Sequence, residues 1–154
     1  MKKNAILGVL AGALLLLTAG GAALAANQIQ CPNRDGGLCV GTGHADEMTG
    51  TRRADEMRGL RGNDTLKADL GNDTLRGGGG DDNLDAGSCY RDVVRAGRGD
   101  DRISVGEGCY SIPPGSQVDG PDEVSCGPGR DVVRGVGGRD VIADDCERVL
   151  EDGS

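Results

Sequence analysis

Apolar side chains recur every nine residues in the middle of the chain, and each stands two residues after an aspartate. A fixed period of this kind is typical of solenoids, in which one repeat unit supplies one structural turn. Glycines fall in the same frame, so each unit is predicted to be a tight turn closed by a carboxylate, followed by a three-residue strand with one inward apolar side chain. The five pairs are Asp46 with Met48, Asp55 with Met57, Asp64 with Leu66, Asp73 with Leu75, and Asp82 with Leu84.

The same frame continues toward the C-terminus with two interruptions. A one-residue slip precedes two further units, and an irregular stretch precedes three more. About ten units therefore cover most of the chain beyond residue 40. The later pairs are Asp92 with Val94, Asp101 with Ile103, Asp122 with Val124, Asp131 with Val133, and Asp140 with Ile142.

The composition leaves little material for an apolar core. The chain of 154 residues has no Trp, no Phe, two Tyr and 29 Gly. Part of its apolar content also lies in the first 25 residues, so the remainder is poorer in hydrophobic side chains than the average suggests. We therefore expect that something other than apolar burial stabilises the fold.

Residues 1–25 are predicted to be an export signal. Two lysines precede an apolar run from Ala5 to Leu17, and a small-x-small cleavage site ends at Ala25. Cleavage there would give a secreted protein, extracellular or at the cell surface, without a membrane segment. The alternative is an uncleaved anchor, because the stretch to Ala26 could nearly span a bilayer core of about 30 Å.

The charge balance favours cations as partners. Removal of the signal deletes two lysines and no acid, so the formal net charge moves from −8 (17 basic, 25 acidic residues) to −10 (15 basic, 25 acidic). Nucleic acid is not expected as a partner, because phosphate binding needs clustered Lys and Arg, whereas these arginines are interspersed with aspartates.

Six cysteines in an exported chain favour three disulfides over free thiols. Zinc is not expected to bind them, since the chain has no C-x-x-C pair and one His. Cys109 with Cys126 competes with the predicted arrangement, and the sequence alone does not fix the connectivity. The predicted pairs are Cys31 with Cys39, Cys89 with Cys109, and Cys126 with Cys146.

Residues 77–85, GGGGDDNLD, match the nonapeptide pattern GGxGxDxUx at every specified position. The two preceding units, GLRGNDTLK at 59–67 and ADLGNDTLR at 68–76, keep the second half of the pattern. The chain therefore resembles the RTX, or hemolysin-type, calcium-binding repeat family. This resemblance implies an all-β fold, a right-handed parallel β-roll (a β-solenoid) with two nine-residue units per coil, here stapled by disulfides.

Two units per coil place the aspartates in two columns, one on each edge of the roll. Asp64 would stack on Asp46 and Asp82, and the alternate units would form the second column. Coils stack at about 4.8 Å. Two carboxylates at about 4.8 Å repel by roughly 3.5 kcal/mol at an effective dielectric constant near 20, so the stack is expected to need a counter-charge.

The resemblance implies Ca²⁺ as that counter-charge, bound between adjacent turns. Calcium prefers six to eight carboxylate and carbonyl oxygens. The family pattern assigns the carboxylate at the sixth position and the carbonyls at the second and fourth positions, with Leu60 and Asp69 at the second position of the weaker units. The predicted ligands are Asp64, Asp73, Asp82, Asp92, Asp101, Asp55, Asp46, Gly62, Gly71, Gly78, Gly80, Gly99, Asp122, Asp131 and Asp140.

Some units depart from the family pattern. In GTRRADEMR at 50–58, Arg52 and Arg53 could neutralise Asp55 directly and leave a metal-free coil. His44 is expected to be an exposed turn residue, because neutral imidazole suits calcium poorly. In the last two units Arg130 and Arg139 directly precede the aspartates, and exposed pairs of that kind contribute little to stability.

Five segments are predicted along the chain. A signal peptide at 1–25 is followed by an N-terminal cap at 26–40 that contains the Cys31/Cys39 loop, then by calcium-binding repeats at 41–108. An irregular insertion occupies 109–121, and further repeats with a C-terminal cap occupy 122–154.

We expect a secreted calcium-binding structural protein whose folding is ordered by calcium. The alternative is a calcium-dependent adhesin that binds a cell surface, the extracellular matrix or a polysaccharide. An enzyme is not expected, since the chain has one His, no HExxH, and no G-x-S-x-G. The acidic clusters follow the period of the scaffold and are not expected to serve glycoside hydrolysis.

Overall fold

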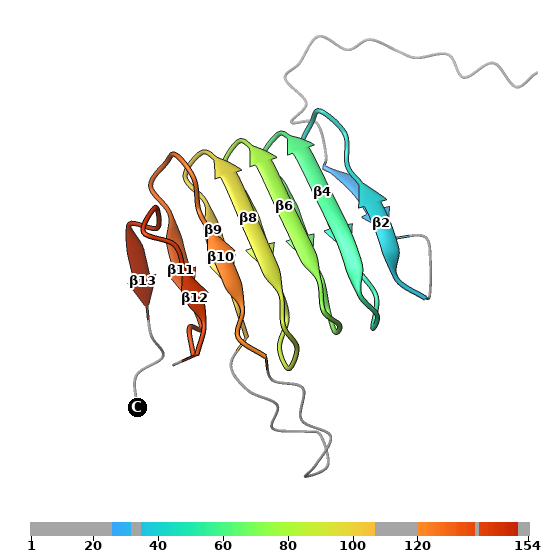
Figure 1. Ribbon diagram of the computed structural model, residues 1–154. Coiled ribbons are helices and arrows are strands. Elements are labelled where there is room, and N and C mark those ends of the chain that lie inside the picture. The colour runs from blue at the N-terminus through green and yellow to red at the C-terminus, as the bar shows by residue number, and fades with distance from the viewer. Residues whose placement is uncertain (1–25, 32–34, 107–119, 138, 151–154) are drawn as a thin grey trace, which may run out of the picture.

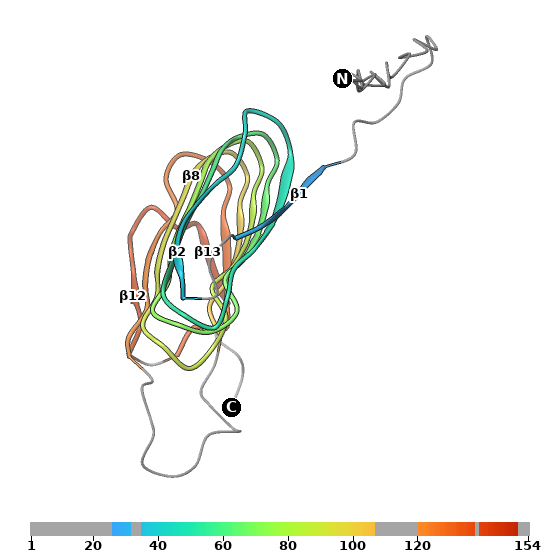
Figure 2. The same cartoon turned by 90° about the vertical axis from the view of Figure 1, so that its right-hand side faces the viewer.

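The computed structural model describes residues 26–31, 35–106, 120–137 and 139–150, which form a parallel β-solenoid (Figure 1). Two parallel sheets face each other, and the chain alternates between them strand by strand. Viewed along the stack, the coils are flattened loops that lie one behind another (Figure 2). The described residues contain no helix that is long and apolar enough to cross a membrane. The predicted signal at 1–25 lies outside them.

The seven-stranded sheet contains the odd-numbered strands in chain order. All of its pairings are parallel. Its strands are β1 Asn27–Gln30, β3 Asp46–Thr49, β5 Thr65–Lys67, β7 Asn83–Asp85, β9 Arg102–Ser104, β11 Val132–Arg134 and β13 Arg148–Leu150.

The six-stranded sheet contains the even-numbered strands, also paired in parallel. Three of them are six or seven residues long. They exceed the predicted three residues because pairing continues into the next turn, where Leu60 lies opposite Gly78 and Arg61 opposite Gly79. The strands are β2 Gly37–Val40, β4 Asp55–Arg61, β6 Thr74–Gly79, β8 Val93–Arg98, β10 Glu123–Ser125 and β12 Val141–Ile142.

The strand register confirms the coil of two units. Met48 lies opposite Leu66, and Leu66 lies opposite Leu84, each eighteen residues on. The one additional residue before Asp92 and the irregular stretch before Asp122 lie outside the strands and leave the register unchanged. Val94 still lies opposite Leu75, and Val124 lies opposite Val94. The predicted insertion falls mostly in residues 107–119, which lie outside the described part of the chain.

The interior contains a continuous apolar column, although the composition leaves little material for an apolar core. The predicted inward side chains are buried, except Ile142 in the last coil, which is partly buried. A small residue at the first position of many units is buried as well, which the sequence reasoning missed. Each coil is so thin that one aliphatic and one small side chain from each half fill it. The core comprises Cys39, Met48, Met57, Leu66, Ala68, Leu75, Leu84, Ala86, Val94, Ala96, Ile103, Val105, Val124, Cys126 and Val133.

Disulfides fasten both ends of the solenoid. Cys31 is bonded to Cys39, and Cys126 to Cys146, each with 5.2 Å between the Cα atoms. Both pairs match the prediction, and the second excludes the competing bond from Cys126 to Cys109. Cys89 is also disulfide-bonded, but its predicted partner, Cys109, lies outside the described residues.

Candidate metal centre

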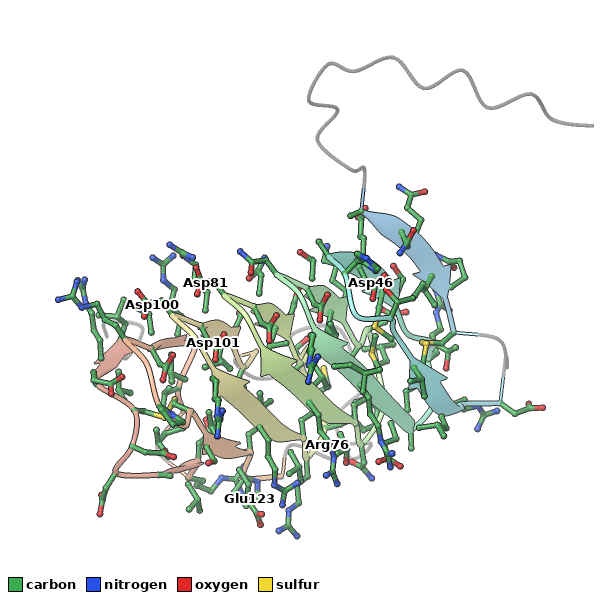
Figure 3. All side chains as sticks on the ribbon, turned by 90° about the horizontal axis from the view of Figure 1, so that it is seen from above. Asp46, Arg76, Asp81, Asp100, Asp101 and Glu123 are labelled. Atoms are coloured by element: carbon green, nitrogen blue, oxygen red, sulfur yellow. A yellow bond between two sulfur atoms is a disulfide. The ribbon has the colours of Figure 1, made fainter. Side chains whose placement is uncertain are left out.

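The aspartates of the repeat form two columns in the interior, one at each edge of the roll. Each aspartate directly precedes or begins a strand, and the alternation of the strand turns its side chain inward beside the apolar residue two positions later. Nine of them are at most 5% exposed, and Asp140, in the last turn, is half-buried. Asp46 and Asp101, both in the first column, are labelled in Figure 3. The first column is Asp46, Asp64, Asp82, Asp101 and Asp131, and the second is Asp55, Asp73, Asp92, Asp122 and Asp140.

One oxygen of each carboxylate links neighbouring coils. The backbone N–H of Asp46 donates to Oδ1 of Asp64 (2.9 Å), and that of Asp64 donates to Oδ1 of Asp82 (2.8 Å). In the second column the N–H of Asp55 donates to Oδ1 of Asp73 (2.7 Å). The same bond continues to the last aspartates of both columns. The columns are therefore chains of charge-assisted hydrogen bonds that run in one direction.

The second oxygen of five carboxylates has no hydrogen-bond partner among the described residues. Burial of an unpaired polar atom costs roughly 1–3 kcal/mol, and more for a charged one. Oδ2 faces the first residue of its own turn, since a Cβ added to Gly59 would lie 2.3 Å from Oδ2 of Asp64, and one added to Gly77 would lie 2.3 Å from Oδ2 of Asp82. The five carboxylates belong to Asp64, Asp73, Asp82, Asp101 and Asp131.

Burial makes these carboxylates hard to ionise. It raises the pKa of Asp73, Asp82 and Asp92 to about 7, and neighbouring carboxylates in the columns add to the effect. Burial likewise raises the pKa of Asp101 to about 6. Asp64 and Asp131 have raised pKa values for the same reason. A bound cation would counteract this rise in pKa, because an opposite charge nearby favours the ionised carboxylate.

The first two turns differ, because a threonine at the second position occupies the free oxygen. Thr42 donates from its backbone N–H to Oδ2 of Asp46 (2.5 Å), and Thr51 donates from its N–H (2.7 Å) and Oγ1 (2.9 Å) to Oδ2 of Asp55. Burial disfavours the charge on Asp46, but hydrogen bonds from Thr42 and Asn27 outweigh it and lower the pKa.

Arg52 and Arg53 do not neutralise Asp55, so that alternative is wrong. Both arginine side chains are exposed. Thr51, which precedes them in the chain, instead hydrogen-bonds Oδ2 of Asp55 through its backbone N–H and its hydroxyl. His44 is exposed, as predicted.

The backbone at the second position separates the two kinds of turn. In all five turns with an unpaired Oδ2 this residue has a positive φ: Leu60 (86°), Asp69 (79°), Gly78 (118°), Gly97 (121°) and Gly127 (92°). The conformation of Leu60 and Asp69 therefore costs about 1–2 kcal/mol each, since L-residues avoid this region. Neither Thr42 nor Thr51 has a positive φ.

The carbonyl oxygens at the second and fourth positions lie along the stack. A Cβ added to Gly78 would lie 2.2 Å from the oxygen of Leu60, and one added to Gly80 would lie 2.2 Å from that of Gly62. The turns thus combine close-packed carbonyls with unpaired carboxylate oxygens. Such all-oxygen donor sets fit calcium, with Gly62, Gly71, Gly78, Gly80 and Gly99, all of positive φ, at the predicted carbonyl positions.

Other predicted ligands depart from this arrangement. Both oxygens of Asp140 accept backbone N–H groups, from Asp122 (3.0 Å) and Gly137 (2.7 Å).

Asp145, Cys126 and Cys146 have potential ligand atoms within 4.8 Å of one another, but the two sulfur atoms form the disulfide and are not thiolate ligands.

The sequence reasoning missed a third column, which is exposed and lies at the fifth turn position. The N–H of Asp81 donates to Oδ1 of Asn63 (3.1 Å), and the N–H of Asp100 donates to Oδ1 of Asp81 (2.9 Å). Asp81 and Asp100 lie on the edge of the solenoid in Figure 3. The signal that could have revealed this column is the recurrence of Asn or Asp directly before the aspartate of the repeat.

A parallel β-solenoid with carboxylate columns at its turns defines a cation-binding repeat protein. The sequence pattern of the family described as RTX calcium-binding nonapeptide repeat (4 copies) matches residues 40–75, 58–88 and 90–108. Residues 40–88 and 90–108 therefore match the RTX calcium-binding repeat family, and the fold is consistent with its β-roll. A search of curated proteins and a search of solved structures each found no match.

Proposed function

We propose that this protein is a secreted structural module that calcium orders. The observation that supports the proposal is the set of five buried Oδ2 atoms without a partner, at Asp64, Asp73, Asp82, Asp101 and Asp131. Bound calcium supplies positive charge and accepts oxygen ligands at these turns. The aspartates and the carbonyls at the second and fourth positions would hold it.

Circular dichroism and thermal unfolding of the oxidised mature protein, in EDTA and in millimolar calcium, test the calcium part. Calcium should raise the unfolding temperature, because it binds the native carboxylates and not the unfolded chain. Magnesium at the same concentration is the control, since it demands a tighter octahedral site. Equal unfolding temperatures in EDTA and calcium would contradict the proposal.

The proposal that the protein is exported is supported by the predicted signal peptide and by the disulfides, since disulfides persist in oxidising compartments. N-terminal sequencing of material from the culture medium should begin at Ala26. A chain that begins at Met1 and remains with the cells would contradict it.

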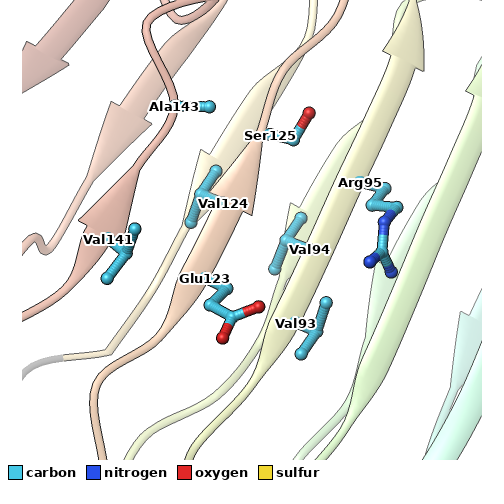
Figure 4. A pocket seen from close by; sticks show the side chains of 8 residues that line it. All are labelled: Val93, Val94, Arg95, Glu123, Val124, Ser125, Val141 and Ala143. Carbon is cyan, nitrogen blue, oxygen red and sulfur yellow. The ribbon is translucent and has the colours of Figure 1, made fainter.

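We also propose that the protein is not an enzyme. The turns use their carboxylates to join coils, and His44 is the single imidazole of the chain. Two open depressions lie on the surface of the described residues. One, of about 200 Å³ between β8, β10 and β12 (Figure 4), is smaller than the roughly 300–1,000 Å³ of typical ligand pockets. The other, of about 500 Å³, is within that range, but its lining contains no imidazole and no thiol.

A second candidate function is supported by a column of arginines on the outer face of the six-stranded sheet. Arg58 lies opposite Arg76, and Arg76 opposite Arg95. All three are outward, and Arg76 is labelled on this side in Figure 3. Oε1 of Glu56 lies 2.6 Å from a nitrogen of Arg58 and 3.8 Å from one of Arg76, so one carboxylate serves two guanidinium groups.

This column suits a linear acidic polysaccharide. Its charges repeat at the strand spacing of about 4.8 Å, close to the length of one sugar ring, and guanidinium groups bind carboxylates in bidentate geometry. Nucleic acid fits less well, because the described surface offers no row of aromatic side chains for base stacking and the chain is acidic overall.

Binding to soluble hyaluronate, a uronate polymer, tests this function. Arg76→Glu with Arg95→Glu should abolish binding, whereas Arg102→Glu with Arg134→Glu makes the same charge change on the other sheet and should leave it. Neutral dextran should not bind. Equal loss in both double variants, or tighter binding to duplex DNA than to hyaluronate, would contradict it.

A further inference from the structure

The two N-terminal turns of the repeat contain carboxylates whose four oxygens are all occupied by the chain. Oδ1 of Asp46 accepts from Nδ2 of Asn27 (3.0 Å), and Oδ1 of Asp55 accepts from the N–H of Gly37 (3.0 Å). The Oδ2 atoms accept from Thr42 and Thr51. Each oxygen of both side chains therefore already accepts at least one hydrogen bond from the chain.

The hydroxyl groups also fix the shape of these turns. Oγ1 of Thr42 accepts the N–H of His44 (3.2 Å), and Oγ1 of Thr51 accepts the N–H of Arg53 (3.2 Å). Each threonine thus bridges its turn from the backbone to the carboxylate, as local Ser and Thr hydrogen bonds do in turns.

Burial does not explain the contrast with the later turns. Asp46 and Asp55 are 1% and 3% exposed, and Asp64 and Asp73 are both 1% exposed. The difference lies at the second turn position. A threonine with negative φ aims its N–H at the carboxylate, whereas the positive φ of Leu60 and its counterparts in later coils leaves Oδ2 unpaired.

We propose that Thr42 and Thr51 replace calcium in the first two turns, so that the N-terminal coil folds without metal and templates the calcium-dependent coils after it. This inference rests on the proposed calcium function and refines it: the metal sites begin at Asp64, and Asp46 and Asp55 are not ligands. The Cys31–Cys39 disulfide fastens the same end of the solenoid. The β3 and β4 edges then present a formed template to β5 and β6.

Hydrogen exchange of the wild-type protein in EDTA tests the template directly. Amides in 37–58 should exchange at least about tenfold more slowly than those in 74–104, because the hydrogen bonds to the first two carboxylates persist without metal. Calcium should then slow exchange in 74–104 and change 37–58 little.

Substitutions at the second turn position test the role of the threonine. Thr51→Gly should speed exchange of the Asp55 turn in EDTA by about tenfold, whereas Thr51→Ser keeps the hydroxyl and should restore protection. Leu60→Thr should rebuild the Thr51 turn around Asp64, since β-branched residues avoid positive φ. It should lower the number of calcium ions bound in equilibrium dialysis, whereas Leu60→Gly, which keeps the positive φ, should leave that number unchanged.

The outcomes separate the two proposals. If wild-type protein binds no calcium, the proposed function fails. If it binds calcium but 37–58 exchanges as fast as 74–104 in EDTA, or if Leu60→Thr binds as many ions as Leu60→Gly, the calcium function stands and the threonine inference is overturned.

Discussion

The fourth position of the glycine-containing turns depends on the absence of a side chain. Gly80 has a φ of 124°, and its backbone packs so closely on the previous coil that an added Cβ would lie 2.2 Å from the oxygen and 2.5 Å from the carbon of Gly62. The contact is with backbone, which cannot rotate away. The neighbouring Gly79 has open space on its Cβ side. Two adjacent glycines thus have different roles.

Gly80→Ala should destabilise the protein by at least about 2 kcal/mol, because it adds a backbone clash to a φ that L-residues avoid. Gly79→Ala should change the free energy of unfolding by no more than about 0.5 kcal/mol. Urea unfolding in calcium measures both. Similar losses in the two variants would show that the close approach to Gly62 is unimportant.

At the two ends of the solenoid no further coil is stacked, and other polar side chains make the hydrogen bonds that its aspartates would make. At the N-terminal end Asn27 donates to Asp46. At the C-terminal end Oε2 of Glu147 accepts the N–H of Asp131 (2.8 Å), where a further aspartate would otherwise stand. Asp145 accepts the N–H groups of Cys126 (3.1 Å) and Gly127 (3.0 Å). These bonds, led by that from Cys126, lower the pKa of Asp145.

Asp145→Ala should therefore loosen the last strands and cost about 1–3 kcal/mol, since two N–H donors lose their acceptor. Faster hydrogen exchange at Cys126 and Gly127 should report it. Asp144→Ala removes the same charge from the exposed neighbouring residue and should leave exchange there unchanged. Equal acceleration in both variants would point to net charge as the cause.

At the scale of the whole molecule, stability depends on pH, because the interior contains buried carboxylates with raised pKa values. The pKa of Asp73, Asp82 and Asp92 is raised to about 7 by burial, whereas unfolded aspartate titrates near 3.9. The native metal-free state therefore holds protons that the unfolded chain has released between these values. Stability from this source is complete below about pH 4 and is lost as the pH rises through about 7.

In EDTA the protein should consequently unfold at a higher temperature at pH 5 than at pH 8. In calcium the dependence should weaken or reverse, because calcium requires the ionised carboxylates and competes with protons. Thermal scans at constant ionic strength measure both series. Greater stability at pH 8 in EDTA would contradict the raised pKa values.

The nine-residue period was enough to predict the sheets, the columns and most inward residues, because a solenoid repeats one local pattern. It missed β1 and β2, where Asn27 and Gly37 stand at the aspartate position and Ile29 and Cys39 supply the inward side chains. It also missed the threonine turns. The exchange of glycine for threonine at one position is a small change in sequence, and its effect depends on the sign of φ, which the pattern does not reveal.

The eighteen-residue register makes the length of the protein adjustable. Residues 68–85 form one full coil, and the residues on either side of it, Lys67 and Ala86, stand at the same points of the repeat as Asp85 and Ala68. Excision of that coil would join equivalent points, and its duplication would insert another. Unequal recombination between such repeats would therefore lengthen or shorten the rod in steps of about 4.8 Å, without any new contact having to evolve.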